Sequence, residues 1–87
     1  MTGLAEIDIL YFAWLRERIG FSRERIETKA ATVADLIGEL TAKSEGHALA
    51  FADQKSLRVA LDQRMADFAA PLTGVREVAF FPPMTGG

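Results

Sequence analysis

The sequence of 87 residues contains no cysteine and one histidine. The absence of cysteine excludes a disulfide, a thiolate metal site and a cysteine nucleophile. The single histidine, His47, excludes a histidine-rich metal cluster and argues against a Ser-His-Asp triad. The glycine-rich phosphate loop of the Walker type is also missing. These absences argue against an enzyme that acts on its own.

The sequence also has little excess charge and no long hydrophobic run. Ten Lys and Arg residues against twelve Asp and Glu residues give a net charge of −2, without a block of one sign. This distribution argues against binding to nucleic acid or to an anionic membrane. The longest apolar run, residues 9–15, is far shorter than the roughly 20 residues of a membrane span. The N-terminus does not resemble a signal peptide, so we expect a soluble protein of the cytoplasm.

What is present is typical of one small globular domain, with 49% hydrophobic and 25% charged residues. Alternation over residues 7–12 predicts a strand, and its later half is expected to be covered on both faces. A short helix over residues 13–19 should follow and stop at Gly20, since glycine favours helix C-termini. Residues 22–28 then predict a second strand that pairs with the first.

The clearest helix is predicted to start at Thr32, an N-cap residue with Asp35 three positions later. Its apolar stripe has helical spacing and consists of Val33, Leu36, Ile37 and Leu40. Glu39 and Lys43 have the spacing of an i,i+4 ion pair. Gly38 lowers helix propensity, so we interpret it as a site of close approach to a neighbouring strand.

The second half of the chain predicts three further strands, over residues 57–61, 65–68 and 76–81, with turns at 62–64 and 71–74. Residues 44–56 are weakly patterned and predict a loop or a short helical turn around 48–51. Met65, Phe68 and Leu72 are expected to pack in the sheet and its turns.

An early hairpin, a crossover helix and strands that return to one mixed sheet predict an α+β, β-grasp (ubiquitin-like) fold. It has one main crossover helix and a short helix inserted after the first strand. A ferredoxin-like split βαβ fold is the alternative, but residues 63–74 do not supply its second helix. We assign the β-grasp domain to residues 1–81 and a projecting tail to residues 82–87.

The tail carries the clearest chemical signal. Pro82 and Pro83 cannot extend a strand ladder, and they favour an extended path away from the sheet. Gly86 and Gly87 have no side chains and can follow a narrow channel. Once activated as an acyl adenylate, the Gly87 carboxylate would accept sulfur or an amine. The alternative is a frayed terminus, since two glycines end about one chain in two hundred by chance; the diproline and the preceding strand favour a carrier.

Two segments resemble one family. Residues 78–87 (VAFFPPMTGG) resemble the C-terminus of the MoaD/ThiS family of ubiquitin-like sulfur carriers, which includes the small subunit of molybdopterin synthase. Residues 11–20 (YFAWLRERIG) resemble that subunit's first strand and the helix inserted after it. The resemblance covers nearly the whole chain. Asp62 stands where the family often has Asn, and Met84 replaces a more usual β-branched residue.

The resemblance implies a sulfur carrier subunit of molybdopterin synthase. An E1-like adenylating enzyme would use ATP to adenylate Gly87, and sulfur transfer would convert it to a thiocarboxylate. The charged tail would then enter the large synthase subunit and donate sulfur to a pterin precursor, forming the molybdopterin dithiolene. The chain would be a non-catalytic subunit of a heterotetramer. It would bind no cofactor or metal itself, because ATP, zinc and pterin belong to its partners.

The resemblance also suggests which residues contact partners. These are Phe12, Arg16, Phe81, Pro82, Pro83, Met84, Thr85 and Gly86. Burial in the sheet is an equal alternative for Phe12 and Phe81, as is solvated surface for Arg16. Phe80 is expected in the core, and His47 is expected to be structural or exposed.

Proteins with two other functions would also end in Gly-Gly. The first is a sulfur carrier for thiamine or another sulfur pathway, although thiamine carriers are typically shorter and lack the inserted helix at residues 13–20. The second is a ubiquitin-like modifier or binding module, in which Gly87 forms an isopeptide bond with a lysine or the tail does no chemistry.

Overall fold

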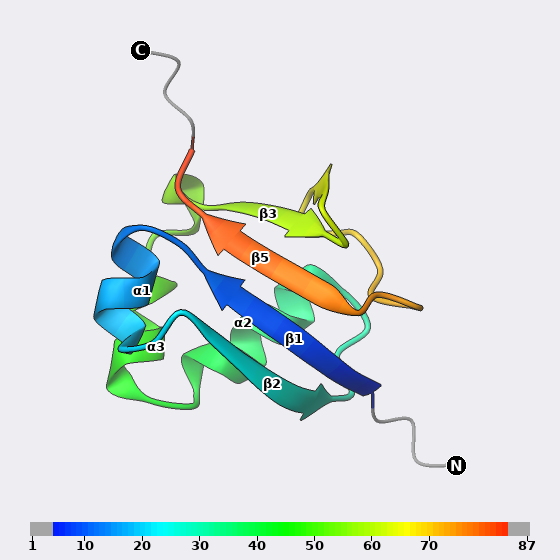
Figure 1. Cartoon of the computed structure of the whole chain (residues 1–87), viewed down its shortest axis with the longest axis horizontal. Helices are drawn as coiled ribbons and strands as arrows, with labels where there is room; N and C mark the ends of the chain where they lie inside the picture. Colours follow the sequence, from blue (N-terminus) through cyan, green and yellow to red (C-terminus); the bar gives the residue numbers. More distant parts are fainter. Residues whose placement is uncertain (1–4, 84–87) are drawn as a thin grey trace.

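The computed structural model describes residues 5–83 (Figure 1). Five strands, three α-helices and one 3-10 turn follow one another with short connections in this part of the chain. In order they are β1 (Ala5–Tyr11), α1 (Trp14–Ile19), β2 (Arg23–Thr28), α2 (Val33–Thr41), α3 (Glu45–Ala50), η1 (Gln54–Ser56), β3 (Arg58–Leu61), β4 (Arg64–Ala66) and β5 (Glu77–Phe81).

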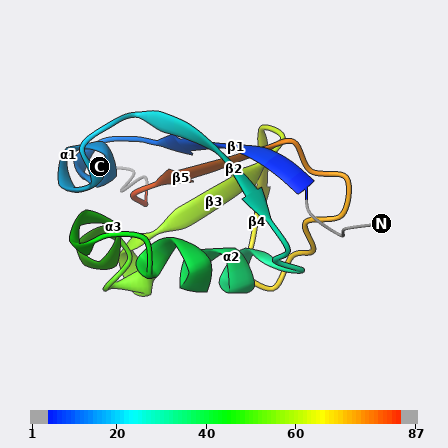
Figure 2. The ribbon, with the colours of Figure 1, turned by 90° about the horizontal axis from the view of Figure 1, so that it is seen from below.

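The five strands form one mixed sheet in the order β2-β1-β5-β3-β4. β1 and β5 are parallel neighbours at its centre, and the other pairs are antiparallel. Figure 2 shows α2 and α3 beneath one face of the sheet, while no described helix covers the opposite face. We call that opposite face the outer face. The arrangement confirms the predicted β-grasp fold, with α2 as crossover helix and α1 as the inserted helix.

The core lies between the sheet and α2. Period-two alternation directs Ile7, Ile9 and Tyr11 of β1 inward, and each is almost fully buried. From the other side, α2 contributes the predicted stripe of Val33, Leu36, Ile37 and Leu40, all buried. Burying one such side chain is worth roughly 1.5–3 kcal/mol, so the alternating strand and the helical stripe stabilise each other.

The predicted N-cap of α2 at Thr32 and the predicted end of α1 at Gly20 are confirmed, but the role predicted for Gly38 is wrong. The Thr32 hydroxyl accepts from the Asp35 N–H at 3.2 Å, as an N-cap does. Gly38 is exposed, and a Cβ there would meet nothing within 4 Å. The close approach is instead at Gly46 of α3, where a Cβ would clash with the backbone carbonyl of Arg18 in α1.

The expected pair of Glu39 and Lys43 is also wrong. Glu39 accepts a hydrogen bond from the Thr28 hydroxyl of β2. Lys43 lies 3.7 Å from a carboxylate oxygen of Glu24, also in β2. Tertiary partners on the edge strand therefore replace the local pair.

Several boundaries in the second half differ from expectation. Residues 44–56 form a true helix, α3, and then η1, and β4 ends at Ala66 rather than at Phe68. Leu72 is buried and Phe68 half-buried, as expected, but Met65 is 66% exposed. Met65 pairs with Ala60, so both side chains lie on the outer face, which no described helix covers.

Asp62 and Gln63 form the two-residue turn between β3 and β4, at φ angles of 50° and 72°. Positive φ at both positions is typical of a type I′ turn. The Asp62 carboxylate also accepts from the backbone N–H groups of Arg76 and Glu77, at 3.0 and 2.9 Å. This residue therefore ties the hairpin turn to the start of β5.

Candidate docking face and tail

The two central strands end together and place four aromatic residues in two layers. Tyr11 of β1 is opposite Phe80 of β5, and the Phe12 N–H donates to the Phe80 carbonyl at 3.1 Å. Tyr11 and Phe80 point inward, where their rings are stacked with centroids 6.4 Å apart. The next residues, Phe12 and Phe81, lie on the opposite side, with Phe12 47% exposed and Phe81 half-buried. The structure thus makes Phe80 a core residue and leaves Phe12 accessible.

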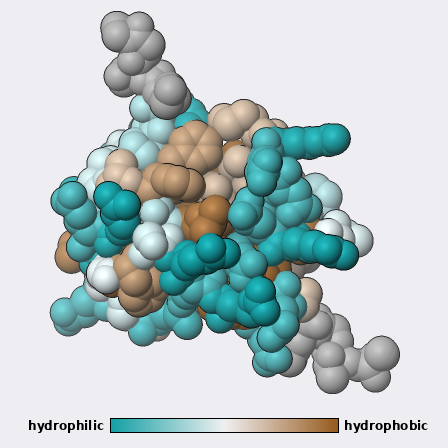
Figure 3. All heavy atoms as spheres, in the orientation of Figure 1, coloured by the Kyte–Doolittle hydropathy of each residue, from teal (hydrophilic) through white to brown (hydrophobic). Residues whose placement is uncertain are grey.

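An open apolar groove of about 430 Å³ lies where β5 ends. It is lined by Phe12, Ala13, Ala79, Phe81, Pro82 and Pro83. Figure 3 shows apolar atoms over the ends of β1 and β5, surrounded by hydrophilic ones. Exposed apolar patches with a polar rim mark interaction sites. The groove therefore brings together four of the residues predicted to contact partners, and we call it the tail-root groove.

The other predicted site residues are not in this groove. Arg16 is exposed on α1, does not line the groove, and makes no ion pair with any residue of the 5–83 segment. The α1 cation that does meet an aromatic ring is Arg18, 4.5 Å above Trp14. The remaining predicted positions, Met84, Thr85, Gly86 and Gly87, lie outside the described residues.

An apolar row continues from the groove across the outer face. Strand register places Leu10 beside Ala79, Ala79 beside Ala60, and Ala60 beside Met65. Cross-strand partners share a face of the sheet, so the row runs from β1 to β4. Sequence reasoning missed this row because its members belong to four different strands, although alternation within each strand marks them.

A charged belt flanks this row on β1 and β2. Arg25 donates to the Asp8 carboxylate at 2.8 Å, and Arg23 lies 3.8 Å from it. The hydrogen bond from Arg25, followed by the charges of both arginines, holds the pKa of Asp8 below its usual range. The outer face thus combines an apolar strip with a zone of paired charges.

A buried polar network, which the sequence did not reveal, lies behind the aromatic layer. The Tyr11 hydroxyl donates to Glu24 Oε2 at 2.6 Å, and His47 Nε2 lies 2.8 Å from the same oxygen. His47 Nδ1 lies 2.7 Å from the Ser44 hydroxyl. Because an ionised carboxylate only accepts hydrogen bonds, His47 Nε2 carries a proton here. The network joins β1, β2 and the start of α3.

Burial and the hydrogen bonds of this network shift the pKa values of Glu24 and Tyr11 in opposite directions. Burial acts to raise the pKa of Glu24, but hydrogen bonds from Tyr11 and His47, together with nearby positive charge, outweigh burial and leave this pKa below its ordinary value. Burial, together with the carboxylate beside it, raises the pKa of Tyr11 far above the ordinary value for tyrosine. His47 is 3% exposed and has hydrogen-bond partners at both ring nitrogens. Its place is therefore structural, one of the two predicted alternatives.

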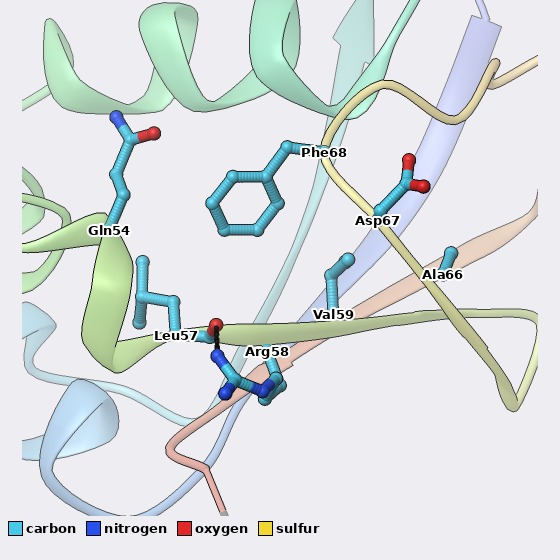
Figure 4. Close-up of a pocket in the computed structure, with 7 residues that line it drawn as sticks. All are labelled: Gln54, Leu57, Arg58, Val59, Ala66, Asp67 and Phe68. Carbon is cyan, nitrogen blue, oxygen red and sulfur yellow. Dashed lines mark hydrogen bonds between the residues drawn. The ribbon is translucent and has the colours of Figure 1, made fainter.

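A second hollow of about 350 Å³ lies between η1, β3 and the segment after β4. Figure 4 shows the Phe68 ring pointing into it, while Arg58 turns away and donates to the Leu57 carbonyl at 2.8 Å. This hollow shares no lining residue with the tail-root groove.

Neither hollow is lined by a set of metal-ligating side chains. Among residues 5–83, no three Asp, Glu or His side chains gather closely enough to hold a metal ion. None of the described helices is long and apolar enough to cross a membrane. What the arrangement offers chemically is an accessible apolar groove at the root of a two-proline segment.

Comparison with known proteins identifies the family. The ThiS family model matches residues 9–87. The molybdopterin synthase sulfur carrier subunits of Escherichia coli (strain K12) and Haemophilus influenzae are 42% and 36% identical to this chain, over 93% of it and 99% of each relative. The putative molybdopterin converting factor, subunit 1, from Pyrococcus furiosus superposes with a TM-score of 0.70 at 25% identity, covering 92% of this chain and 99% of that one. The chain therefore belongs to the ThiS family.

Proposed function

We propose that this chain carries sulfur as a thiocarboxylate on Gly87 and acts as the small subunit of molybdopterin synthase. The observation that carries the proposal is near-full-length identity of 36–42% to two sulfur carrier subunits of that enzyme. The family match extends to Gly87 itself. Because those relatives are named for molybdopterin synthase, they favour this role over a carrier for thiamine and over a protein modifier.

The chemistry requires two steps at the Gly87 carboxyl group. First, a carboxylate oxygen attacks the α-phosphorus of ATP on an E1-like enzyme, which releases pyrophosphate and leaves an acyl adenylate. Second, a sulfur nucleophile of sulfide oxidation state attacks the acyl carbon and displaces AMP, which leaves a thiocarboxylate. With no cysteine in the chain, the carboxyl terminus is the one place where it can hold transferable sulfur. The large synthase subunit then receives the tail and the pterin precursor.

The described part of the chain supplies the handle for this tail. Phe12 and Phe81 form an apolar surface beside Pro82 and Pro83, where the chain leaves β5. Aromatic side chains in such places commonly dominate the binding energy of an interface. The fixed φ angles of the two prolines lower the entropy that the tail loses when a partner orders it. We propose that the large subunit and the adenylating enzyme dock at the tail-root groove.

Mass spectrometry tests the carrier chemistry. The full chain is incubated with the adenylating enzyme, ATP and a sulfur source, and a gain of about 16 Da at Gly87 is expected, since sulfur replaces one oxygen. A chain that lacks Gly87 serves as the control and should gain nothing, although its fold stays intact. No gain by the wild-type chain, under conditions that charge a known carrier, contradicts the proposal.

Pull-down from cells separates the three candidate roles. A stable complex with a pterin-binding large subunit supports the synthase role. Conjugates linked through lysine would instead show a modifier, and a complex with thiamine-forming enzymes would show the other carrier role. Either of those results, without the large subunit, overturns the proposal.

A further inference from the structure

The residue between Phe12 and α1 has a backbone conformation that suits glycine. Ala13 has φ 56° and ψ −133°, and the Leu15 N–H donates to the Phe12 carbonyl at 3.2 Å across it. These angles are those of the first central position of a type II′ turn, where glycine predominates. An alanine at this position is strained, because its Cβ crowds the backbone at positive φ.

The fold itself explains the turn but not the methyl group. The hydrogen bonds around the turn are all between backbone atoms: Phe12 N–H to Phe80 carbonyl at 3.1 Å, and Arg16 N–H to Ala13 carbonyl at 3.2 Å. A glycine at position 13 would make the same hydrogen bonds. Ala13 is also exposed, so its methyl group contributes little to the hydrophobic core. In stability terms, glycine would serve at least as well.

Ala13 lines the tail-root groove together with Phe12, Phe81 and the two prolines that start the tail. Its side chain is the methyl group alone. A glycine here would remove apolar surface from the groove and loosen the segment that carries Phe12, since glycine has more accessible conformations.

We propose that the Ala13 methyl group contacts the large synthase subunit rather than stabilising the fold, and that this contact helps to position the large subunit at the root of the tail. The inference rests on the proposed function, because it needs a partner that docks at this groove. It predicts that stability and binding respond to one substitution in opposite ways.

The test compares Ala13→Gly with a matched control, Ala34→Gly, in the full chain. Ala34 is exposed on α2, which covers the sheet face opposite the groove. Ala13→Gly should leave Tm unchanged or raise it, because relief of strain offsets the added flexibility of the unfolded chain. Ala34→Gly lacks that relief and should lower Tm by about 2–4 °C, because the cost of a glycine in the first turn of α2 is at the lower end of the range for helices.

Binding to the large synthase subunit, measured by calorimetry, should show the reverse order. Ala13→Gly should raise Kd about fourfold, the factor that corresponds to burying one CH₂ group, whereas Ala34→Gly should bind as the wild-type chain does. Wild-type Kd for Ala13→Gly overturns the inference, as does a loss of Tm equal to that of Ala34→Gly. Failure of the wild-type chain itself to bind overturns the proposed function, and this inference with it.

Discussion

Replacing Tyr11 by Phe removes one hydroxyl group from the buried polar network and leaves the aromatic layer in place. The ring stacks on Phe80 and meets the Phe51 ring edge-on, with centroids 6.4 Å apart in both pairs. The hydroxyl donates to Glu24 Oε2 at 2.6 Å, and the Glu24 side chain is 15% exposed. Tyr11→Phe therefore tests the hydrogen bond to Glu24 without creating a cavity.

The loss of unfolding free energy in Tyr11→Phe depends on the charge of the acceptor, the Glu24 carboxylate. Hydrogen bonds to charged groups contribute about 1.5–3 kcal/mol, and this one is short and sheltered from water. For a domain of this size, that loss corresponds to a Tm lower by roughly 6–24 °C. His47 remains as a donor to the same oxygen, so Glu24 keeps one of its two strong hydrogen bonds. In a Glu24→Gln background, Tyr11→Phe should cost less, because the acceptor is neutral.

The pH dependence gives a sharper signature. The pKa of Glu24 is lowered in the folded state, so its contribution is present above its ordinary value of 4.5 and is lost as pH falls through the folded pKa. The pKa of Tyr11 is raised, so its contribution is complete below the ordinary value of 10.0 and declines as pH rises above it. The difference in unfolding free energy between wild type and Tyr11→Phe should thus be largest at intermediate pH.

Urea unfolding from pH 3 to pH 11, followed by fluorescence and circular dichroism, measures that difference. Tyr11 is the one tyrosine of the sequence, so ultraviolet absorbance reports its ionisation directly. A cost below about 0.5 kcal/mol, the lower bound for a net hydrogen bond, would refute the reasoning. A cost that stays constant across the whole pH range would refute it too.

Three further substitutions test the face and the packing. Phe12→Ala should weaken binding to the large subunit about tenfold or more, with a small effect on Tm, because a half-exposed aromatic side chain acts as a contact rather than as part of the core. Leu49→Ala, which also changes an exposed residue, is the control. Equal effects of the two substitutions on affinity would contradict the assignment of Phe12 as a contact residue. Asp62→Ala should lower the unfolding free energy by about 1–3 kcal/mol, since two backbone N–H groups lose their acceptor. Asp62→Asn should lower it less, because the amide oxygen can still accept. Equal urea midpoints for the wild-type chain and Asp62→Ala would contradict this prediction. Gly46→Ala should destabilise the chain in thermal unfolding because its Cβ meets the carbonyl of Arg18, and an unchanged Tm would show that α1 and α3 can separate without cost.

Local patterns were sufficient for most of the secondary structure. The side chains of β1 alternate because one face of the strand packs against helices and the other faces solvent. The polarity of each residue therefore indicates its face without knowledge of the rest of the fold. Thr32 and Gly20 mark helix ends because their side chains, or the lack of one, act on the nearest turn. The order of these elements then allowed few topologies, which is why the β-grasp fold was predictable.

Interactions between distant segments were not predictable. Glu24 and His47 are far apart in the sequence, and no local pattern links an edge strand to α3. Gly38 and Gly46 look alike in the sequence, yet the backbone of α1 leaves no room for a Cβ at Gly46, whereas the space beside Gly38 is open. Met65 was assigned to packing because its hydrophobicity says nothing of which sheet face a helix covers.

For the candidate site, the sequence by itself contains the tail motif and predicts the chemistry proposed for it, since glycine and proline act through the backbone wherever they stand. The tertiary structure decided which aromatic residues are accessible. Parallel pairing of β1 and β5 sets Tyr11 opposite Phe80, so the pair faces inward and Phe12 and Phe81 are left on the other side. That outcome depends on strand register, because a shift of one residue would exchange the two faces.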